Sequence, residues 1–207
     1  MDMDRVDREP VATDLLLPLH GEVLFDEREV RKRINEIAGE TIERYRGVNP
    51  LFICLLKGAA PFATDLMRNI ARQDPFFHPQ MDYMMVSTYG DERQPGVPKI
   101  VTDLDPKIRE TIPGRTVIIL DDVLEWGITV RYVSDVMFVR EADAVDLIAL
   151  VQKDMPERTA FGNADIYGFR APKAWLTGMG MDDVRVAPEG NRWLGYIATG
   201  NPIEEEL

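Results

Sequence analysis

The feature that most constrains the fold of this chain is the stretch Val117–Val130, which reads VIILDDVLEWGITV. Four apolar residues run into two adjacent carboxylates, Asp121 and Asp122, and Gly127 precedes a helix-like pattern. This order indicates a buried strand that turns and opens a helix, which aims backbone N–H groups at whatever lies above the sheet. Because two carboxylates at its end do not stabilise an apolar strand, we expect them to bind a ligand. The alternative is a pair of solvated carboxylates that cap the turn.

Strand and helix patterns alternate on both sides of this stretch. Asp26 and Glu29 have the spacing of a capping box ahead of a helix that runs to about Arg46. The apolar runs in LFICLLKG (51–58) and AVDLIALVQK (144–153) predict strands that are buried on both faces, the first followed by a lysine and a glycine and the second ending in a lysine. The other expected elements are helices over 59–72 and 129–141, a strand over 81–88, a mobile loop over 89–99 and shorter strands beyond 164. This alternation predicts an α/β fold with a mainly parallel central sheet flanked by helices.

Three segments with chemically active side chains follow the predicted strands. They are Leu56-Lys57-Gly58, the stretch from Asp121 to Thr129, and Lys153. In a parallel sheet, ligands bind beyond the carboxyl ends of the strands, so this common placement predicts one site. Each lysine taken alone would be an ordinary strand-end lysine, and the prediction therefore depends on all three segments together.

Length and charge limit the classes of partner. The 207 residues suffice for one domain with a sizeable core, and residues 1–12 are expected to be a frayed acidic tail. The formal net charge of −12 argues against nucleic acid or an anionic membrane as a general partner. No apolar run approaches the roughly 20 residues of a membrane span and no secretory signal is present, so we expect a cytoplasmic protein. The single cysteine, Cys54, is expected to be a buried, inert thiol.

The stretch from Asp121 to Thr129 resembles the phosphoribosyl pyrophosphate loop of the type I phosphoribosyltransferases. Other segments resemble the hypoxanthine-guanine phosphoribosyltransferases in particular, in the right order from about Leu51 to Ile197. These segments are LLKGAAPFATDLMR (55–68), STYGD (87–91), DLDPKIR (103–109), ADIYGFRAP (164–172) and GMGMD (178–182). The resemblance implies the type I phosphoribosyltransferase fold in a single domain over 1–207. It also implies a small hood built from the N- and C-terminal segments, with 164–207 contributing to base binding.

The resemblance also implies a reaction. A 6-oxopurine, hypoxanthine or guanine, would attack C1 of magnesium-bound phosphoribosyl pyrophosphate and give the nucleoside 5′-monophosphate and pyrophosphate, a step of purine salvage. Mg²⁺ would be the metal, and the chain would form a homodimer or homotetramer. Asp121 and Asp122 would hold the ribose hydroxyls and one Mg²⁺, and Glu125 would manage the proton on N7 of the base.

The remaining roles are carried over by position. The 5′-phosphate would be held by the Trp126, Gly127 and Ile128 backbone with the Thr129 hydroxyl. Pyrophosphate would be received by Leu56, Lys57, Gly58 and Arg192, and in the family the leucine–lysine bond is often cis. The purine would be contacted by Lys153 at its 6-oxo group, by Trp175 through stacking and by the Leu176 backbone, while Asp182 would bind a second Mg²⁺. Arg192 follows a segment, 183–191, that is longer than in the family.

The chain departs from the family at Glu125 and Trp126. Glutamate for aspartate keeps the carboxylate but moves it by one methylene. Trp126 replaces a hydroxyl residue, and a hydrogen bond to a charged phosphate is worth about 1.5–3 kcal/mol. Three interpretations follow: an active 6-oxopurine enzyme with an altered loop, an enzyme of this class with another nucleobase, and a non-catalytic nucleotide-binding regulator. The retained site residues favour catalysis; they are Lys57, Asp122, Lys153 and Asp182.

Overall fold

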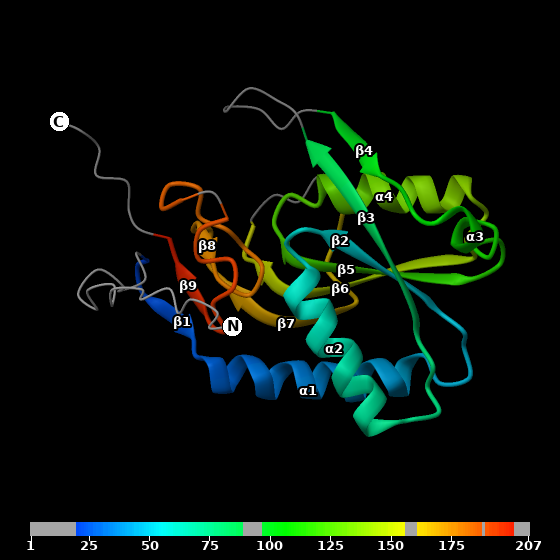
Figure 1. Ribbon diagram of the computed structural model, residues 1–207, viewed down its shortest axis with the longest axis horizontal. Helices are drawn as coiled ribbons and strands as arrows, with labels where there is room; N and C mark the ends of the chain where they lie inside the picture. The colour runs from blue at the N-terminus through cyan, green and yellow to red at the C-terminus, as the bar shows by residue number, and fades with distance from the viewer. Residues whose placement is uncertain (1–19, 89–96, 156–160, 188, 201–207) are drawn as a thin grey trace, which may run out of the picture.

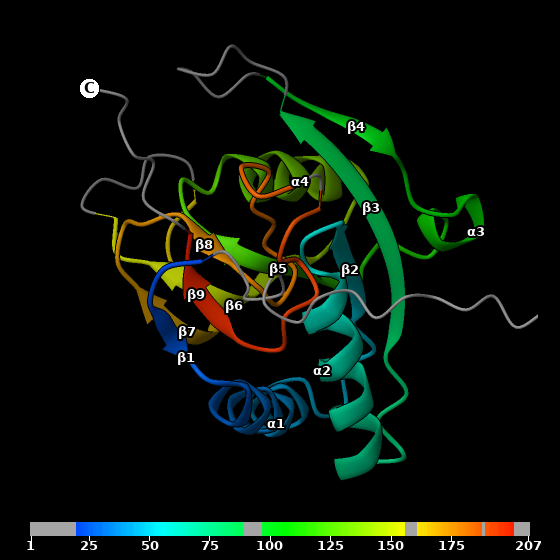
Figure 2. The same cartoon turned by 60° about the vertical axis from the view of Figure 1, so that its left-hand side comes forward.

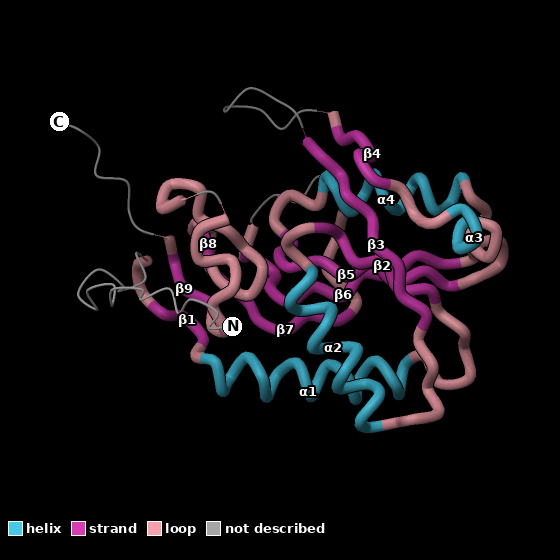
Figure 3. The backbone as a smooth tube through the Cα atoms, viewed as in Figure 1, coloured by secondary structure: helices cyan, strands magenta, loops and turns pink. Residues whose placement is uncertain are grey.

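A six-stranded sheet forms the centre of the computed structural model, which describes residues 20–88, 97–155, 161–187 and 189–200. The strand order is β4-β3-β2-β5-β6-β7 (Figures 1 and 3). The strands are β2 (Leu51–Leu56), β3 (Gln80–Thr88), β4 (Pro98–Thr102), β5 (Thr116–Leu124), β6 (Ala144–Lys153) and β7 (Ile166–Ala171). All neighbouring pairs are parallel except β3 and β4, which are antiparallel. The predicted α/β fold with a mainly parallel sheet is confirmed.

Helices cover both faces of this sheet. Helices α1 (Glu27–Arg44) and α2 (Ala60–Gln73) pack together on one face, and α4 (Ile128–Val139) lies on the opposite face (Figure 2). The short α3 (Pro106–Arg109) joins β4 to β5. The predicted capping box of α1 is present, because the Asp26 carboxylate accepts the Glu29 N–H at 2.8 Å and Glu29 returns the bond. The helix ends at Arg44, two residues before the predicted end.

The core lies between the central strands and these helices. The apolar residues of β2 and the first half of β5 are almost fully buried, as expected for strands covered on both faces. Cys54 is buried in β2, and burial raises the pKa of its thiol to about 12. The prediction of a buried cysteine is confirmed.

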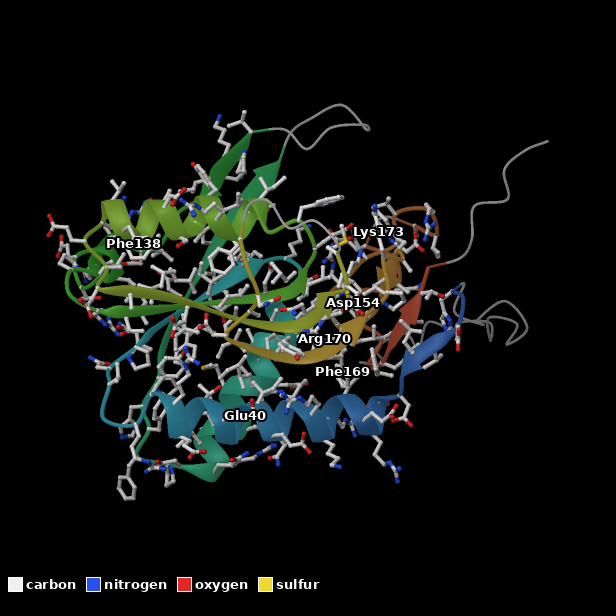
Figure 4. The ribbon with its side chains drawn as sticks, turned by 180° about the vertical axis from the view of Figure 1, so that it is seen from behind. Glu40, Phe138, Asp154, Phe169, Arg170 and Lys173 are labelled. Carbon is white, nitrogen blue, oxygen red and sulfur yellow. The ribbon has the colours of Figure 1, made fainter. Side chains whose placement is uncertain are left out.

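A second, three-stranded sheet joins the two ends of the chain into a hood. Its antiparallel strands are β1 (Val23–Phe25), β9 (Ile197–Thr199) and β8 (Leu176–Thr177), in that order. The Phe25 and Phe169 rings stack with centroids 4.1 Å apart and thereby tie the hood to β7, and Figure 4 shows Phe169 at the end of the body nearest the hood. The Arg33 guanidinium fixes α1 to the same strand by donating to the Tyr167 and Gly168 carbonyls.

β2 ends at Leu56, and Lys57 and Gly58 lie in the following turn, as predicted. Two other predicted boundaries are wrong. β5 continues to Leu124, because Val123 and Leu124 keep the parallel pairing with β6, and the two aspartates therefore lie inside the strand. Pro98 and Lys99 belong to β4 and not to a loop. The rest of that predicted loop, 89–96, and the predicted tail, 1–12, lie outside the described residues.

Within the described part of the chain, no helix has both the length and the apolar character needed to cross a membrane.

Candidate active site

Two adjoining cavities open beyond the carboxyl ends of β5 and β6. The first, of ≈ 150 Å³, is lined by Asp122, Val123, Glu125, Lys153, Trp175, Leu176, Met181 and Asp182. The second, of ≈ 240 Å³, is lined by Asp121 and by the run from Val123 to Val130. Val123 and Glu125 line both cavities, so a ligand that fills both would pass over the end of β5. The structure thus brings together most of the predicted site residues from the hood and the sheet.

The turn from β5 into α4 forms the wall of the second cavity. Gly127 has φ +68°, a left-handed conformation that L side chains rarely adopt, and a Cβ there would lie 2.8 Å from Phe161. Helix α4 begins at Ile128 with no side-chain cap and no acidic residue in its first turn. Because the first N–H groups of a helix lack partners within the helix and carry partial positive charge, this end suits an anion. The Thr129 side chain belongs to the same turn and adds a hydroxyl.

Trp126, at the position that departs from the family, lies at the outer edge of this turn. It lines the second cavity and is 40% exposed. The Lys173 ammonium lies 5.2 Å from the centroid of its indole, a cation–π contact. Figure 4 shows Lys173 beside the loops of the hood. The tryptophan therefore connects the helix-opening turn to the loop that leads to Trp175.

An ion pair joins the two cavities to the end of β6. The Lys153 ammonium donates to a Glu125 carboxylate oxygen at 2.7 Å, and the lysine side chain is only 7% exposed. Both residues line the first cavity. A carboxylate that can accept a proton and a buried ammonium that can donate a hydrogen bond thus face the same space.

Asp121 and Asp122 are two adjacent carboxylates held partly out of water. Burial raises the pKa of Asp121 well above its ordinary value, and the charge of Asp122 raises it further. Burial also raises the pKa of Asp122. Their negative charges are disfavoured in the ligand-free chain, so a bound cation or hydroxyl groups would stabilise them.

Trp175 forms the hood side of the first cavity. Its indole N–H donates to the Asp182 carbonyl at 3.3 Å, and the Arg185 guanidinium lies over the ring at 5.3 Å from its centroid. Arg185 is held in place by Asp183, which accepts from its Nε at 2.6 Å. The hydrogen bond from Arg185 lowers the pKa of the Asp183 carboxyl. The aromatic wall of the cavity is therefore fixed by an ion pair behind it.

The loop after β2 approaches the site from the other side. The Leu56–Lys57 peptide bond is cis. A Cβ on Gly58 would overlap the Asp122 carboxylate, and a Cβ on Gly180, which has φ +107°, would overlap the Gly58 carbonyl. Only glycine permits these approaches. They place the turn after β2 between β5 and the loop over 178–182.

Lys57 and Arg192 lie at this edge and do not line either cavity. Lys57 is paired with Glu189. Arg192 is buried, and its guanidinium pairs with Glu189, donates to the Gly180 carbonyl and lies 2.9 Å from an Asp182 oxygen. The predicted pyrophosphate residues are thus connected to the first cavity through Asp182.

Sequence reasoning missed Glu189 and Lys173. Glu189 belongs to the long segment over 183–191, where the resemblance offers no counterpart, and no spacing in the sequence links it to Lys57. Lys173 is far from Trp126 in the sequence, and only the arrangement of β7 and the hood brings them together. No local signal would have found either residue.

The carboxylates of the site suit a hard divalent cation. Among the described residues, no group of three or more histidine, cysteine, aspartate or glutamate side chains could hold a metal ion alone. Mg²⁺ usually takes only one or two carboxylates and completes its shell with water and ligand phosphates. Asp121, Asp122 and Asp182 supply oxygens of this kind, and burial raises the pKa values of the first two, so a bound cation would stabilise their charged forms.

The chain is similar to known proteins over most of its length. The sequence profile of the phosphoribosyl transferase domain matches residues 20–183. The hypoxanthine-guanine phosphoribosyltransferase of Bacillus subtilis (strain 168) is 35% identical over 185 residues, which are 89% of this chain and 95% of that protein. Its counterpart from Streptococcus thermophilus (strain CNRZ 1066) is 33% identical over 187 residues, 89% and 94% of the two chains. A crystal structure of a hypoxanthine phosphoribosyltransferase from Staphylococcus aureus superposes with a TM-score of 0.75 at 26% identity, covering 89% of this chain and 93% of that one.

Replacing Asp121 with asparagine is expected to stabilise the ligand-free chain by about 1–3 kcal/mol at pH 8. Because the pKa of Asp121 is raised in the folded chain, the folded chain holds a proton that the unfolded chain has released. The stability of the native chain therefore falls as pH rises from the ordinary carboxyl range toward the raised value. Asparagine does not titrate, so the advantage of the variant should widen over that interval. Urea unfolding at a series of pH values measures it.

The matched control is Asp143→Asn, which removes an exposed carboxylate in the turn before β6. It should change stability by less than about 0.5 kcal/mol at every pH. An advantage of Asp121→Asn that stays constant or shrinks with rising pH would show that the carboxylate carries no unfavourable charge.

Proposed function

This chain belongs to the hypoxanthine-guanine phosphoribosyltransferase family, and from that premise we propose how its residues divide the work. It is a purine phosphoribosyltransferase, which transfers the phosphoribosyl group of phosphoribosyl pyrophosphate to hypoxanthine or guanine and releases pyrophosphate, as in purine salvage. The structure and the relatives favour this activity over a non-catalytic nucleotide-binding regulator. The observation that carries the proposal is the Glu125–Lys153 pair at 2.7 Å in a cavity walled by Trp175.

The purine occupies the first cavity. Trp175 supplies an aromatic face, and the Leu176 backbone lies at the edge of the base. The buried Lys153 ammonium donates a hydrogen bond to the 6-oxo group. An amino group at that position would face this donor with a donor of its own, so a 6-oxopurine is preferred over adenine.

Glu125 accepts the proton that the purine releases at N7 as a ring nitrogen bonds to C1. Its carboxylate already accepts a hydrogen bond from Lys153, which fixes its orientation toward the base. The residue is one methylene longer than the aspartate of the family, and it accepts its hydrogen bond from Lys153 at this greater length. Proton transfer of this kind raises the electron density on the attacking nitrogen.

The ribose 5′-phosphate occupies the second cavity. The backbone N–H groups of Trp126, Gly127 and Ile128 and the Thr129 hydroxyl surround the phosphate at the start of α4. Asp121 and Asp122 accept hydrogen bonds from the ribose hydroxyls. This contact compensates the unfavourable burial of the two carboxylates.

Pyrophosphate leaves toward Leu56, Lys57, Gly58 and Arg192. The Lys57 ammonium and the Arg192 guanidinium stabilise the negative charge that grows on the leaving group. We propose that Asp121 and Asp122 would hold one Mg²⁺ and Asp182 a second, together with oxygens of the substrate. Such ions would supply positive charge that offsets the charge of the diphosphate.

Broader predictions accompany this assignment. We propose that the chain works as one domain over 1–207, with residues 164–207 contributing to base binding. We also propose a cytoplasmic enzyme without nucleic-acid or membrane partners. By family resemblance, its assembly is a homodimer or homotetramer.

Incubation with Mg²⁺, phosphoribosyl pyrophosphate and each of four bases tests the function. Hypoxanthine and guanine should be converted, and kcat/KM for adenine should be at least about 100-fold lower, because Lys153 would meet an amino group. Xanthine is the fourth base to be tested as a substrate, and product formation is followed by ultraviolet absorbance. No turnover with any base, combined with tight nucleotide binding by calorimetry, would identify a regulator instead.

Glu125→Gln tests the proton acceptor. The amide keeps the shape of the side chain and can still accept a hydrogen bond from Lys153, but it cannot take the proton. We expect kcat to fall by about 10²–10⁴-fold and KM for the base to change by much less. Glu125→Asp, which restores the family's residue, is the control and should stay within about tenfold of the native kcat. A kcat that survives Glu125→Gln would remove the residue from proton transfer.

Trp126→Thr tests the altered phosphate loop. The variant restores a hydroxyl beside the phosphate, so KM for phosphoribosyl pyrophosphate should stay equal or fall by up to about tenfold. Lys173→Met is the control, because it removes the cation from the indole but leaves the loop intact, and its KM should lie within about twofold of native. A large loss of activity in Trp126→Thr would mean that the indole positions the loop that carries Trp175.

A further inference from the structure

The Glu189 carboxylate lies between the two cations that the proposed function gives to pyrophosphate. One of its oxygens accepts from the Lys57 ammonium, and the other accepts from the Arg192 guanidinium. No motif assigned a role to this residue. The same arginine also lies 2.9 Å from Asp182, so two cations and two carboxylates form one chain of contacts.

The backbone at Glu189 adopts a conformation that a glutamate rarely takes. Its φ is +61°, and Asn191 two residues later has φ +59°. The loop is closed by the Asp183 N–H, which donates to the Gly190 carbonyl at 2.8 Å, and by the Gly190 N–H, which donates to the Ala187 carbonyl at 2.8 Å. A left-handed residue that is not glycine persists only where the surroundings impose it, and such residues gather at functional sites.

The chemistry of this contact conflicts with pyrophosphate binding. The hydrogen bonds from Lys57 and Arg192 lower the pKa of Glu189, so it is a carboxylate at neutral pH. A diphosphate that approached both cations would meet this negative charge at the same donors. Like charges at such distances repel, so both anions cannot use the two cations together.

We propose that Glu189 is an internal competitor for the pyrophosphate subsite. In the ligand-free chain its carboxylate occupies Lys57 and Arg192 and holds them in place, and the diphosphate displaces it on binding. The inference rests on the proposed function of those two cations. Glu189 thereby lowers the affinity for phosphoribosyl pyrophosphate and for the released pyrophosphate, which favours product release.

The exposure of Lys57 and Glu189 allows the diphosphate to displace the Glu189 carboxylate. The side chains of Lys57 and Glu189 are 56% and 42% exposed, so the carboxylate can turn into water without leaving a buried charge. Arg192 is different, because its side chain is only 9% exposed and it stays anchored by the Gly180 carbonyl and Asp182. The subsite therefore combines one buried, anchored cation, one exposed cation and an exposed carboxylate that can turn into water.

Glu189→Gln tests this proposal, because it removes the charge and keeps the shape. We expect KM for phosphoribosyl pyrophosphate and the calorimetric Kd for magnesium pyrophosphate to fall by roughly three- to tenfold. KM for the purine should not change. Glu189→Asp keeps the charge and should stay nearer the native values than Glu189→Gln does. If the residue only orients Arg192, Glu189→Gln would raise both constants and so overturn the proposal, as would unchanged constants.

Two further variants complete the test. Glu141→Gln changes another exposed glutamate with a left-handed backbone, φ +66°, beyond the C-terminal end of α4, and should leave both constants unchanged. In a Lys57→Gln background, the gain from Glu189→Gln should shrink, because Arg192 is then the one remaining cation of the pair for which the two anions compete. Absence of turnover in the native chain would reject the proposed function, whereas pyrophosphate binding by calorimetry still decides the role of Glu189.

Discussion

The parallel pairing of β5 between β2 and β6 is the constraint on which the rest of the structure depends. It aligns the carboxyl ends of three buried strands, and each end delivers charged side chains to the same edge. Two of the approaches at that edge are possible only with glycine, since Gly58 lies against the Asp122 carboxylate and Gly180 lies against the Gly58 carbonyl. The geometry of the site therefore depends on close backbone packing as well as on side-chain contacts.

Charge is distributed unevenly within the site, and its acidic and basic parts correspond to different groups of the nucleotide that we propose as the ligand. Burial raises the pKa values of Asp121 and Asp122, and the charge of Asp122 raises that of Asp121 further. The start of α4 offers N–H groups without an acidic residue in its first turn. Lys153 is compensated by Glu125, while Lys57 and Arg192 are compensated by Glu189. The ligand-free chain thus pairs these cations internally and keeps two buried carboxylates with raised pKa values, a distribution that suits the magnesium-bound substrate that we propose.

The departures from the family are accommodated by neighbours that are distant in sequence. Trp126 lies against Lys173, so the indole gains a partner from the hood loop in place of a phosphate contact. Glu125, with its extra methylene, forms an ion pair with Lys153. The long segment over 183–191 supplies Asp183, which fixes Arg185 behind Trp175, and also Glu189. Residues of this segment thus contact both the aromatic wall of the first cavity and the two cations Lys57 and Arg192.

The sequence by itself determined the α/β class, the capping box of α1, the buried cysteine and the identity of the strand that carries the aspartates, because these follow from local periodicity and spacing. It also predicted that Lys57, Asp121 and Lys153 lie near one edge, since parallel strands share their carboxyl ends. It misplaced the end of β5, because pairing with β6 continues the strand past the charged residues. Only the tertiary structure decided that Glu189 faces Lys57 and that Lys173 faces Trp126. Contacts between segments far apart in the chain depend on how the hood packs against the sheet, and no local pattern encodes that packing.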